Sequence, residues 1–453
     1  MIPAALLTRM RDLLGNEYDA FCEALAAPDT HALRINTVKA DHATVLPHLP
    51  FTPTPLSYLN EGFLIPDGER AGLHPFHHAG AYYIQDPSAM ATVAAIPFPL
   101  SGMRVLDLCA APGGKSTQLA AAIGEGGLLI SNEIVASRAR ILLSNVERMG
   151  LKNTVVMNTD PPAIRTLFDR YFDLVVVDAP CSGEGMLRKY PAAAEEWSEA
   201  GVAAAAARSR LILDDAAATV REGGHLLFST CTFSEEENED AVTAFLARHP
   251  DFALVPPSPA VTAVTADGIY RAGRPQEITL TRRFYPHLAP GEGQYIALMQ
   301  RTAGGTGGVL YREAPTRQDR RAEGEARAAI EAICPLPEGR LHLAGDDLYL
   351  LPEGFLLPPR AVVRAGVALL TRAGKQYLPH HHAAAALGKR FHSTLDLAPD
   401  DPRLAAYLHG EEIEASAGSA GFTAVTVAGV PLGLAKCTQG RAKNHYPKGL
   451  RTK

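Results

Sequence analysis

The chain has 453 residues, of which 47% are hydrophobic and 20% are charged, and its formal net charge is −6. This length is enough for two or three domains, and the composition is ordinary for a folded globular protein. The negative net charge argues against a general polyanion binder. No apolar run approaches the roughly 18 residues needed to span a bilayer, and no signal peptide is expected at the start. We therefore expect no membrane partner.

The cysteines and histidines give no pattern typical of a metal site. Six cysteines are scattered without a Cys-x-x-Cys pair, which argues against a zinc ribbon and against a disulfide framework. Reduced thiols in the cytoplasm are the natural interpretation. The run His380–His382 has no cluster of Asp, Glu or Cys nearby, and three adjacent histidines cannot all face one ion. We therefore expect no metal.

Strand and helix patterns alternate through the middle of the chain. The first 75 residues predict a small mixed segment, with a helix over residues 4–26 and a strand over Ala32–Thr37. From Arg104 to about Gln300, the alternation is typical of a doubly wound parallel sheet. The predicted strands are Met103–Leu108, Gly127–Asn132, Thr154–Met157, Asp173–Asp178, His225–Ser229 and Tyr295–Met299. The predicted helices cover about residues 115–123, 136–149, 200–221 and 235–248.

The last third begins with a glycine-rich stretch, Thr302–Gly308, which predicts a flexible linker. A charged helix is expected from Gln318 to Ile333. Farther on, Gly421–Val427 alternates, turns at Ala428 and Gly429 and continues into Val430–Leu434, which predicts a hairpin in a small β domain. We therefore divide the chain into residues 1–75, 76–300, 301–390 and 391–453.

A loop of small residues follows the strand Met103–Leu108 and leads into a helix. A phosphate-binding Walker A loop is a poor match, because Cys109 occupies its first glycine position and Pro112 removes an amide. The dinucleotide pattern Gly-x-Gly-x-x-Gly is absent as well. S-adenosylmethionine has no phosphate and needs close backbone approach, which small residues allow. The loop residues are Cys109, Ala110, Ala111, Pro112, Gly113, Gly114 and Lys115.

Four acidic residues stand at the ends of four successive strands. Asp107 is placed to meet the amine of this cofactor, Glu133 to accept its ribose hydroxyls and Asp160 to address its adenine amino group. Asp178 ends the fourth strand. A single acid at a strand end is more often a cap or turn residue, but four in register behind such a loop favour S-adenosylmethionine.

Two cysteines, Cys181 and Cys231, lie just past the carboxyl ends of strands four and five, where ligands gather in an open parallel sheet. Methylating carbon 5 of cytosine requires a thiolate that adds at carbon 6, an acid near ring nitrogen 3 and a base for the carbon 5 proton. Asp178 and the two cysteines could supply these parts. Ser234 and Glu237 predict a capping box, whose helix would favour a thiolate at Cys231. Either cysteine alone would be interpreted as a core residue.

Four motifs resemble those of the RNA cytosine-5 methyltransferases: Asp178–Gly185, Ser229–Thr232, Tyr82–Met90 and Leu33–Thr37. The resemblance covers about residues 30–300 and implies an α/β fold with a Rossmann-like class I S-adenosylmethionine-dependent methyltransferase core. In that family the cysteine after threonine is the nucleophile and the cysteine after proline promotes product release. The resemblance thus assigns these roles to Cys231 and Cys181. DNA cytosine-5 methyltransferases attack from the Pro-Cys position instead, and the chemistry alone leaves both assignments open.

The same resemblance implies contacts with the cofactor. It carries over the loop Cys109–Lys115 together with Glu133, Asp160 and Asp178 as cofactor-binding positions. The chemistry of carbon 5 methylation also predicts a contact of Asp178 with the cytosine ring nitrogen. From the residues alone, a lysine between a strand and a helix often points into solvent, so Lys115 has that alternative interpretation.

The C-terminal end is basic, with six Lys or Arg and no acid from Gly433 to Lys453. Its segments Pro431–Lys436 and Lys443–Arg451 resemble the end of the bacterial RsmF-type 16S ribosomal RNA methyltransferases. That resemblance implies a small N-terminal domain before the core and a C-terminal PUA-like β domain after it. It places on RNA, through phosphate contacts or base stacking, Lys436, Arg441, Lys443, Tyr446, Lys448 and Arg451. A frayed, solvated tail is the alternative.

We therefore predict a monomeric cytoplasmic enzyme that transfers a methyl group from S-adenosyl-L-methionine to carbon 5 of a cytosine in ribosomal RNA. Its partner is ribosomal RNA or the small ribosomal subunit, and the target cytosine is unpaired or flipped out. The pair Arg188-Lys189 could line the RNA cleft, with exposed, unpaired charges as the alternative. Two other functions stay open: a transfer RNA cytosine-5 methyltransferase and a non-catalytic RNA-binding or ribosome-assembly factor.

Overall fold

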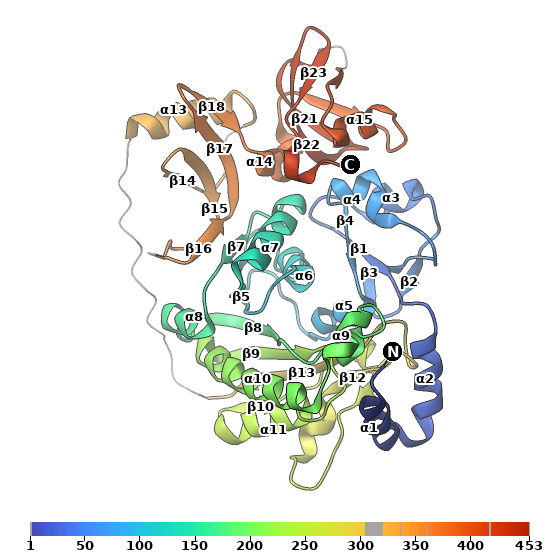
Figure 1. The fold of residues 1–453 in the computed structure, drawn as a ribbon. Coiled ribbons are helices and arrows are strands. Elements are labelled where there is room, and N and C mark those ends of the chain that lie inside the picture. The colour runs from blue at the N-terminus through green and yellow to red at the C-terminus, as the bar shows by residue number, and fades with distance from the viewer. Residues whose placement is uncertain (1, 304–319, 336, 359, 416–417, 453) are drawn as a thin grey trace.

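Four β-sheets organise the chain in the computed structural model, which describes residues 2–303, 320–335, 337–358, 360–415 and 418–452 (Figure 1). The first sheet lies in the N-terminal part, and the largest lies in the middle of the chain. The third and fourth sheets follow in the C-terminal third. The order of these sheets along the chain agrees with the predicted sequence of a small domain, an α/β core and a C-terminal β domain.

The N-terminal helical segment differs from the single helix predicted over residues 4–26. It consists of helix α1 (Ala4–Leu14) and helix α2 (Tyr18–Ala26), with a short 3₁₀ turn over Gly15–Glu17. Gly15 ends α1 with a positive φ of 52°, a conformation that glycine adopts without steric penalty. Phe21 of α2 packs against Phe233, so this segment lies against the loop that follows Cys231.

The N-terminal sheet is antiparallel, in the order β2-β3-β1-β4. Its strands are β1 (Ala32–Ile35), β2 (Thr54–Leu56), β3 (Leu59–Leu64) and β4 (Tyr82–Gln85). Strand β4 pairs along its whole length with β1. The predicted domain boundary at residue 75 therefore falls too early, because it separates β4 from the strand that satisfies its backbone hydrogen bonds.

The central sheet has the order β11-β12-β13-β9-β8-β5-β6-β7-β16, and β10 also pairs with β13. The short strands at its β13 end are β10 (Phe252–Leu254), β11 (Ala266–Asp267) and β12 (Arg282–Phe284). Strands β9, β8, β5, β6 and β7 are parallel, as predicted, and β13 runs antiparallel to β9. The six strands predicted from the sequence are present as β5 (Arg104–Asp107), β6 (Leu128–Asn132), β7 (Thr154–Met157), β8 (Phe172–Asp178), β9 (Val220–Thr230) and β13 (Gln294–Arg301).

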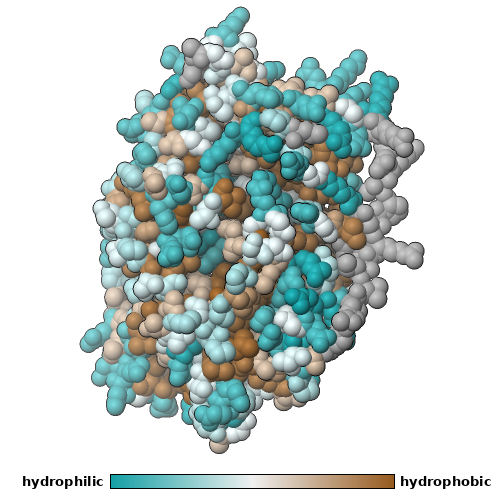
Figure 2. Space-filling model, turned by 180° about the vertical axis from the view of Figure 1, so that it is seen from behind, coloured by the Kyte–Doolittle hydropathy of each residue, from teal (hydrophilic) through white to brown (hydrophobic). Residues whose placement is uncertain are grey.

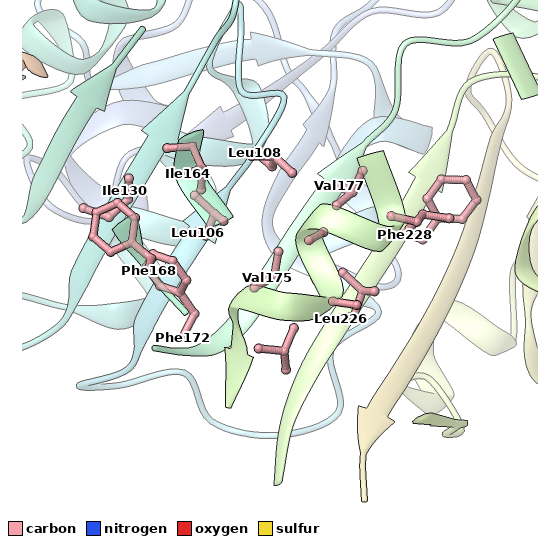
Figure 3. Packing of buried hydrophobic residues seen from close by; sticks show 14 of the residues in the cluster. Leu106, Leu108, Ile130, Ile164, Phe168, Phe172, Val175, Val177, Leu226 and Phe228 are labelled. Atoms are coloured by element: carbon pink, nitrogen blue, oxygen red, sulfur yellow. The ribbon is translucent and has the colours of Figure 1, made fainter. Parts of the chain in front are cut away.

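Helices cover both faces of this sheet, because successive strand residues point to opposite sides. On β8, Val175 and Val177 face one cluster and Leu174 and Val176 face the other. The first cluster takes residues from α8 (Pro161–Leu167), α10 (Glu199–Thr219) and α11 (Glu239–Arg248), and part of it is drawn in Figure 3. The second takes residues from α5 (Pro87–Ala94), α6 (Gly114–Ile123) and α7 (Ala136–Arg148).

Two predicted helices have different bounds from those expected. Helix α10 ends at Thr219, because β9 already begins at Val220. Helix α11 begins at Glu239 rather than near residue 235, and no side chain caps it. The predicted capping box is therefore wrong. Ser234 and Glu237 instead make hydrogen bonds to the loop that carries Cys181.

The intermediate region contains helix α13 (Arg320–Glu331), a four-stranded sheet and helix α14 (His381–Leu387). The sheet strands are β14 (Arg340–Ala344), β15 (Asp347–Leu351), β17 (Val367–Ala373) and β18 (Gln376–Pro379). Strand β16 (Val362–Ala365) leaves this region and pairs with β7 at the edge of the central sheet. Most of the predicted linker Thr302–Gly308 lies outside the described residues, as do residues 318 and 319 of the predicted helix.

The C-terminal domain contains the predicted hairpin, formed by β21 (Gly421–Val427) and β22 (Val430–Thr438). The turn residues Ala428 and Gly429 both have positive φ, which this tight connection requires. Strands β19 (Thr394–Leu397), β20 (Ile413–Glu414) and β23 (Arg441–Asn444) complete the sheet, and helix α15 (Arg403–His409) covers it. This domain shares a core with the N-terminal sheet, beside which it lies in Figure 1.

Hydrophobic residues on the surface are scattered rather than gathered. The face seen from behind in Figure 2 mixes hydrophilic and hydrophobic residues from top to bottom. Large exposed side chains such as Leu73, Ile141 and Leu211 come from separate elements, which is normal for a folded surface. Within the described ranges, each helix is too short or too polar to cross a membrane.

Candidate active site

A pocket of about 460 Å³ opens at the carboxyl ends of β5, β8 and β9. Its wall includes Asp107, Asp178 and Cys231, which the sequence analysis singled out. The loop after β5 contributes Cys109, Ala110, Ala111, Pro112, Gly114 and Lys115. The structure therefore brings three strand ends and the small-residue loop together around one space, as expected for an open parallel sheet.

The small-residue loop requires glycine at one position and fits it closely at the next. Gly113 has a φ of +114°, which L residues with a side chain rarely adopt. An added Cβ at Gly114 would lie 3.1 Å from the side chain of Gln85, which also lines the pocket. Gly114, the first residue of α6, lines the pocket without a side chain, so a ligand can approach the main chain closely there.

Asp107 carries an unpaired carboxylate oxygen in the pocket wall. Its Oδ2 accepts a hydrogen bond of 2.6 Å from the Ser116 hydroxyl, whereas its buried Oδ1 has no partner within the described part of the chain. Burial raises the pKa of Asp107 to about 7, and the neighbouring Asp178 adds to this rise, while the Ser116 bond opposes it. A buried acceptor without a donor is costly. The amine of S-adenosylmethionine is a donor of the right charge for this position.

Glu133 and Asp160 lie outside the lining of this pocket. Glu133 is buried, accepts the backbone N–H of Val135 and lies 3.3 Å from the guanidinium of Arg138. Asp160 is exposed and accepts the backbone N–H of Ala163, which caps α8. The cap interpretation thus describes Asp160 in this structure. The cofactor contacts of both residues stay predictions.

Asp178 is held at the end of β8 by three donors. The Lys115 ammonium lies 2.8 Å from Oδ2, and Oδ1 accepts from the Ser229 hydroxyl at 2.7 Å and from the Gln294 amide at 3.2 Å. Lys115 is 9% exposed, so the solvent-facing alternative is wrong. Burial lowers the pKa of Lys115, but the charge of Asp178, its hydrogen bond and the nearby Cys231 and Asp107 together outweigh burial, and the net shift is upward. A fixed ion pair therefore lies beside Cys231.

The two cysteine sulfurs lie 3.4 Å apart. This proximity follows from the pairing of β8 with β9, in which Asp178 lies opposite Ser229 and each cysteine follows its strand. Cys231 lines the pocket, and the thiol of Cys181 adjoins it. The hydrogen bond to Cys231 and burial both raise the pKa of Cys181 well above its ordinary value. The geometry thus presents one thiol to the pocket and keeps the second within reach of it.

Arg188 and Lys189 are neither exposed nor unpaired. Arg188 makes two hydrogen bonds to the buried carboxylate of Glu292 and also binds main-chain carbonyls of the N-terminal domain. Lys189 donates to Asp86 and to the carbonyl of Thr30. The alternative of exposed, unpaired charges is therefore wrong, because this pair joins the Cys181 loop to the N-terminal domain. Lys189 also lines the pocket, and a contact of the pair with RNA stays a prediction.

Several pocket residues were not identified from the sequence as site residues. The N-terminal domain contributes Tyr83 and Gln85 from β4, within a motif that the sequence analysis quoted without assigning roles. Gln294 comes from β13, and no sequence signal pointed to it. Tyr190 lines the pocket and is 61% exposed, so its ring lies at the rim. These residues reach the site only through the packing of distant segments.

The C-terminal basic residues divide into exposed and structural ones. Lys436 and Lys443 are exposed and lie directly opposite each other on β22 and β23. Cross-strand neighbours point to the same face, and like charges in that arrangement repel. Phe422 lies opposite Lys436 on the other side, and the Lys436 ammonium is 5.2 Å from its ring centre. Lys448 is also exposed.

The predicted stacking role of Tyr446 is corrected by the structure. Tyr446 is only 3% exposed and packs against His381 and Tyr407 in the core shared by the C-terminal and N-terminal domains. A ring enclosed in this way has no free face for a base. Arg451 donates to the carbonyl of Tyr446, and Arg441 pairs with Glu412.

The chain matches three protein-family descriptions along its length. Residues 97–300 match the family described as 16S rRNA methyltransferase RsmB/F. Residues 2–87 match the N-terminal domain of 16S rRNA methyltransferase RsmF, and residues 394–452 match the methyltransferase RsmF PUA domain. The expected fold class is confirmed, with an S-adenosylmethionine-dependent methyltransferase core between an N-terminal domain and a PUA domain.

Solved structures with a similar fold include a methyltransferase homolog protein from Pyrococcus horikoshii. It is 26% identical, with a TM-score of 0.57 over 65% of this chain and 93% of that one. NSun6 from Pyrococcus horikoshii, solved with SFG, is 21% identical, with a TM-score of 0.57 over 67% of this chain and 99% of that one. The latter likeness shows the fold alone.

Curated relatives match nearly the whole chain. The ribosomal RNA small subunit methyltransferase F of Klebsiella pneumoniae (strain 342) is 32% identical over 99% of this chain and 96% of its own length. The protein of the same name from Escherichia coli (strain 55989 / EAEC) is 32% identical over the same shares. The expected cofactor, S-adenosyl-L-methionine, is confirmed by this kinship. The chain belongs to the RsmF family of ribosomal RNA small subunit methyltransferases.

Proposed function

We propose that this protein methylates carbon 5 of an unpaired cytosine in 16S ribosomal RNA through a covalent intermediate between Cys231 and the cytosine. One observation carries the chemistry: Cys231 lines the same pocket as the cofactor loop and Asp178, with Cys181 3.4 Å from its sulfur. Two thiols and a carboxylate match what carbon 5 methylation requires. The names of the relatives support small-subunit ribosomal RNA as the substrate.

The cofactor supplies an electrophilic methyl group when it is bound. Asp107 would hold the cofactor amine through its unpaired oxygen, and the backbone of Cys109–Lys115 would line the cofactor. Glu133 and Asp160 stand at the ends of the next two strands, on the side that we assign to the ribose and adenine. Asp178 lies between this loop and Cys231, so it can contact both the cofactor and the base.

In the proposed reaction, the Cys231 thiolate adds to carbon 6 of the cytosine and forms a carbon–sulfur bond. The negative charge that develops at ring nitrogen 3 is met by the Lys115 ammonium, which Asp178 holds in an ion pair. Ser229 and Gln294 orient the Asp178 carboxylate. After carbon 5 has gained the methyl group, Cys181 takes the carbon 5 proton as a thiolate, having first given its own proton to solvent. The hydrogen bond to the Cys231 thiol, which raises the pKa of Cys181 most, is lost once Cys231 is bonded to carbon 6. The electrons of the carbon 5–hydrogen bond re-form the ring double bond, the carbon–sulfur bond breaks and the Cys231 thiolate is regenerated.

The C-terminal domain is proposed to hold the RNA. Lys436, Lys443 and Lys448 are exposed. Lys436 and Lys443 lie opposite each other, so a bound RNA phosphate would reduce the repulsion between their charges. His445 and Phe422, whose rings are 5.7 Å apart, replace Tyr446 as the aromatic groups available beside these lysines. Arg441, which pairs with Glu412, and Arg451, which donates to the carbonyl of Tyr446, complete the basic surface.

The substrate is tested by incubating the protein with total RNA and S-adenosylmethionine that carries a tritiated methyl group. We expect label in the 16S fraction that co-migrates with 5-methylcytidine after digestion to nucleosides. Label confined to transfer RNA would support the transfer RNA alternative, and an unlabelled RNA pool would support a non-catalytic assembly factor. Bisulfite mapping of ribosomal RNA from a strain that lacks the gene then identifies the cytosine.

Cofactor binding is expected to strengthen as pH rises from about 5.5 to 7.5. The pKa of Asp107 is raised to about 7, so the carboxylate that meets the cofactor amine is largely protonated below this range and ionised above it. The cofactor amine itself stays protonated up to about pH 7.7. We expect the dissociation constant, measured by calorimetry, to fall about tenfold across this window.

The substitution Asp107→Asn serves as the control for this pH dependence. It keeps the size of the side chain and removes its charge. We expect binding that is weaker by about tenfold or more at pH 7.5, as for the loss of a hydrogen bond to a charged group, and that does not change with pH. A wild-type affinity that stays constant from pH 5.5 to 7.5 would exclude Asp107 as the partner of the amine.

A further inference from the structure

Two buried glutamates connect the two loops that carry Cys181 and Cys231, because each accepts hydrogen bonds from the opposite loop. Glu237, after Cys231, accepts the backbone N–H of Ser182 at 2.9 Å and also the Ser182 hydroxyl. Glu184, after Cys181, accepts the backbone N–H of Phe233 and the hydroxyl of Ser234, both at 2.9 Å. Each carboxylate thus satisfies a backbone amide of the opposite loop. We refer to these two glutamates and their three partners as the carboxylate clasp.

Ser234 and Glu237, the residues of the predicted capping box, both belong to the clasp. Glu237 is fully buried and Glu184 is 3% exposed, and carboxylates are buried in this way only when hydrogen bonds satisfy them. Burial raises the pKa of Glu237 to about 7, the charge of Glu184 adds to the rise, and the two bonds from Ser182 oppose it. A pair of acids at this position is therefore held by specific bonds to the cysteine loops.

The two halves of the clasp act on different cysteines. Ser182, which Glu237 holds, directly follows Cys181, and its hydroxyl also lies 2.8 Å from that of Thr232. Cys231 has other support, because it directly follows β9 and its carbonyl accepts the backbone N–H of Gly185. Glu184 reaches residues two and three positions beyond Cys231 and also accepts from the Trp197 indole. Loss of Glu237 therefore loosens Cys181 more than Cys231.

We propose that Glu237 is a positioning residue that holds Cys181 against the cytosine adduct at Cys231, so that Glu237 sets the rate of product release rather than the rate of methyl transfer. This inference rests on the proposed function, since it takes Cys231 as the nucleophile and Cys181 as the group that accepts the carbon 5 proton. The bonds that Ser182 donates to Glu237 fix the residue next to Cys181, whose sulfur lies 3.4 Å from that of Cys231. Without them the proton acceptor is misplaced after the methyl group has been transferred.

The test compares Glu237→Ala, Glu237→Gln and Glu236→Ala in the full-length protein with 16S RNA. Alanine removes the acceptor of the Ser182 N–H, whereas the glutamine carbonyl can still accept that bond. Glu236 is the matched control, because this neighbouring glutamate is half-exposed and pairs with Arg9 outside the clasp. Single-turnover methyl transfer, multiple-turnover rate and the denaturation-resistant RNA–protein complex are measured for each variant.

For Glu237→Ala we expect single-turnover methyl transfer close to wild type, a multiple-turnover rate lower by about tenfold or more, and accumulated covalent complex. Glu237→Gln restores turnover, and Glu236→Ala behaves as wild type. Wild-type turnover in Glu237→Ala, an equal loss of transfer and release, or trapping in Glu237→Gln as strong as in Glu237→Ala would each overturn the inference.

Two further variants keep the test decisive. If Glu237→Ala does not fold, as judged by thermal unfolding and cofactor binding, Ser182→Ala replaces it, because it removes the hydroxyl bonds to Glu237 and Thr232 and keeps the backbone N–H. We expect partial trapping from Ser182→Ala, and its absence would then overturn the inference. Cys181→Ala distinguishes a failure of the proposed function from a failure of the role proposed for Glu237. If it forms no trapped complex, the proposed function fails, whereas trapping by Cys181→Ala alone rejects only the role of Glu237.

Discussion

The substitution Cys231→Ala is expected to abolish methyl transfer to RNA and to form no covalent complex. The thiolate of Cys231 makes carbon 5 nucleophilic by adding at carbon 6. Among the described residues, one other thiol lines the pocket, that of Cys109. Burial and nearby carboxylates raise the pKa of Cys109, so it is a poor nucleophile. We expect the rate of label incorporation to fall by about four orders of magnitude.

Cofactor affinity provides the control for Cys231→Ala. The change removes one sulfur atom and leaves Asp107 and the loop Cys109–Lys115 in place, so the dissociation constant for S-adenosylmethionine should stay near the wild-type value. Cys22→Ala, at a half-buried thiol of the N-terminal helical segment, is expected to keep full activity. Substantial methylation by Cys231→Ala with normal cofactor binding would rule out the covalent mechanism through this residue.

The substitution Cys181→Ala is expected to trap the RNA on the protein. Methyl transfer still proceeds through Cys231, but the proton acceptor that lies 3.4 Å from its sulfur is gone. Elimination then depends on water, and the carbon–sulfur bond persists. We expect about one methyl group per protein molecule in a burst, with turnover reduced by about two to three orders of magnitude, as for the loss of a general base. Denaturing gel electrophoresis with labelled RNA detects the complex.

The double variant Cys181→Ala/Cys231→Ala is the matched control, because it lacks the attacking thiol and should leave the RNA free. The two single variants together also decide between the two assignments that chemistry leaves open. If Cys181→Ala is inactive and Cys231→Ala traps RNA, the attack comes from the Pro-Cys position, as in the DNA cytosine-5 methyltransferases. Normal turnover by Cys181→Ala would remove Cys181 from the release step.

Local sequence patterns predicted most of the central sheet. The apolar runs that became β5 through β9 each have the length of one buried strand and are bounded by helical patterns, so their identity and order follow from short-range periodicity. The end of α10 could not be predicted as well. The alanine-rich sequence favours helix throughout, and the helix ends where β9 begins to pair with β8. The predicted domain boundary at residue 75 is misplaced for the same reason, because β4 pairs with β1, which lies about fifty residues earlier in the chain.

The sequence by itself determined the candidates at this site: a small-residue loop after the first strand, acids at strand ends and one cysteine after each of two neighbouring strands. These features are local, since each depends on a strand and the few residues that follow it. The tertiary structure alone decided that the two sulfurs lie 3.4 Å apart and that Gln294 joins Lys115 at Asp178. It also placed Glu237, an expected capping-box residue, as the acceptor of the Ser182 backbone N–H, and it enclosed Tyr446 in a core shared between domains. Such contacts join residues that are dozens to hundreds of positions apart, and they depend on strand register and domain packing, which no short-range pattern encodes.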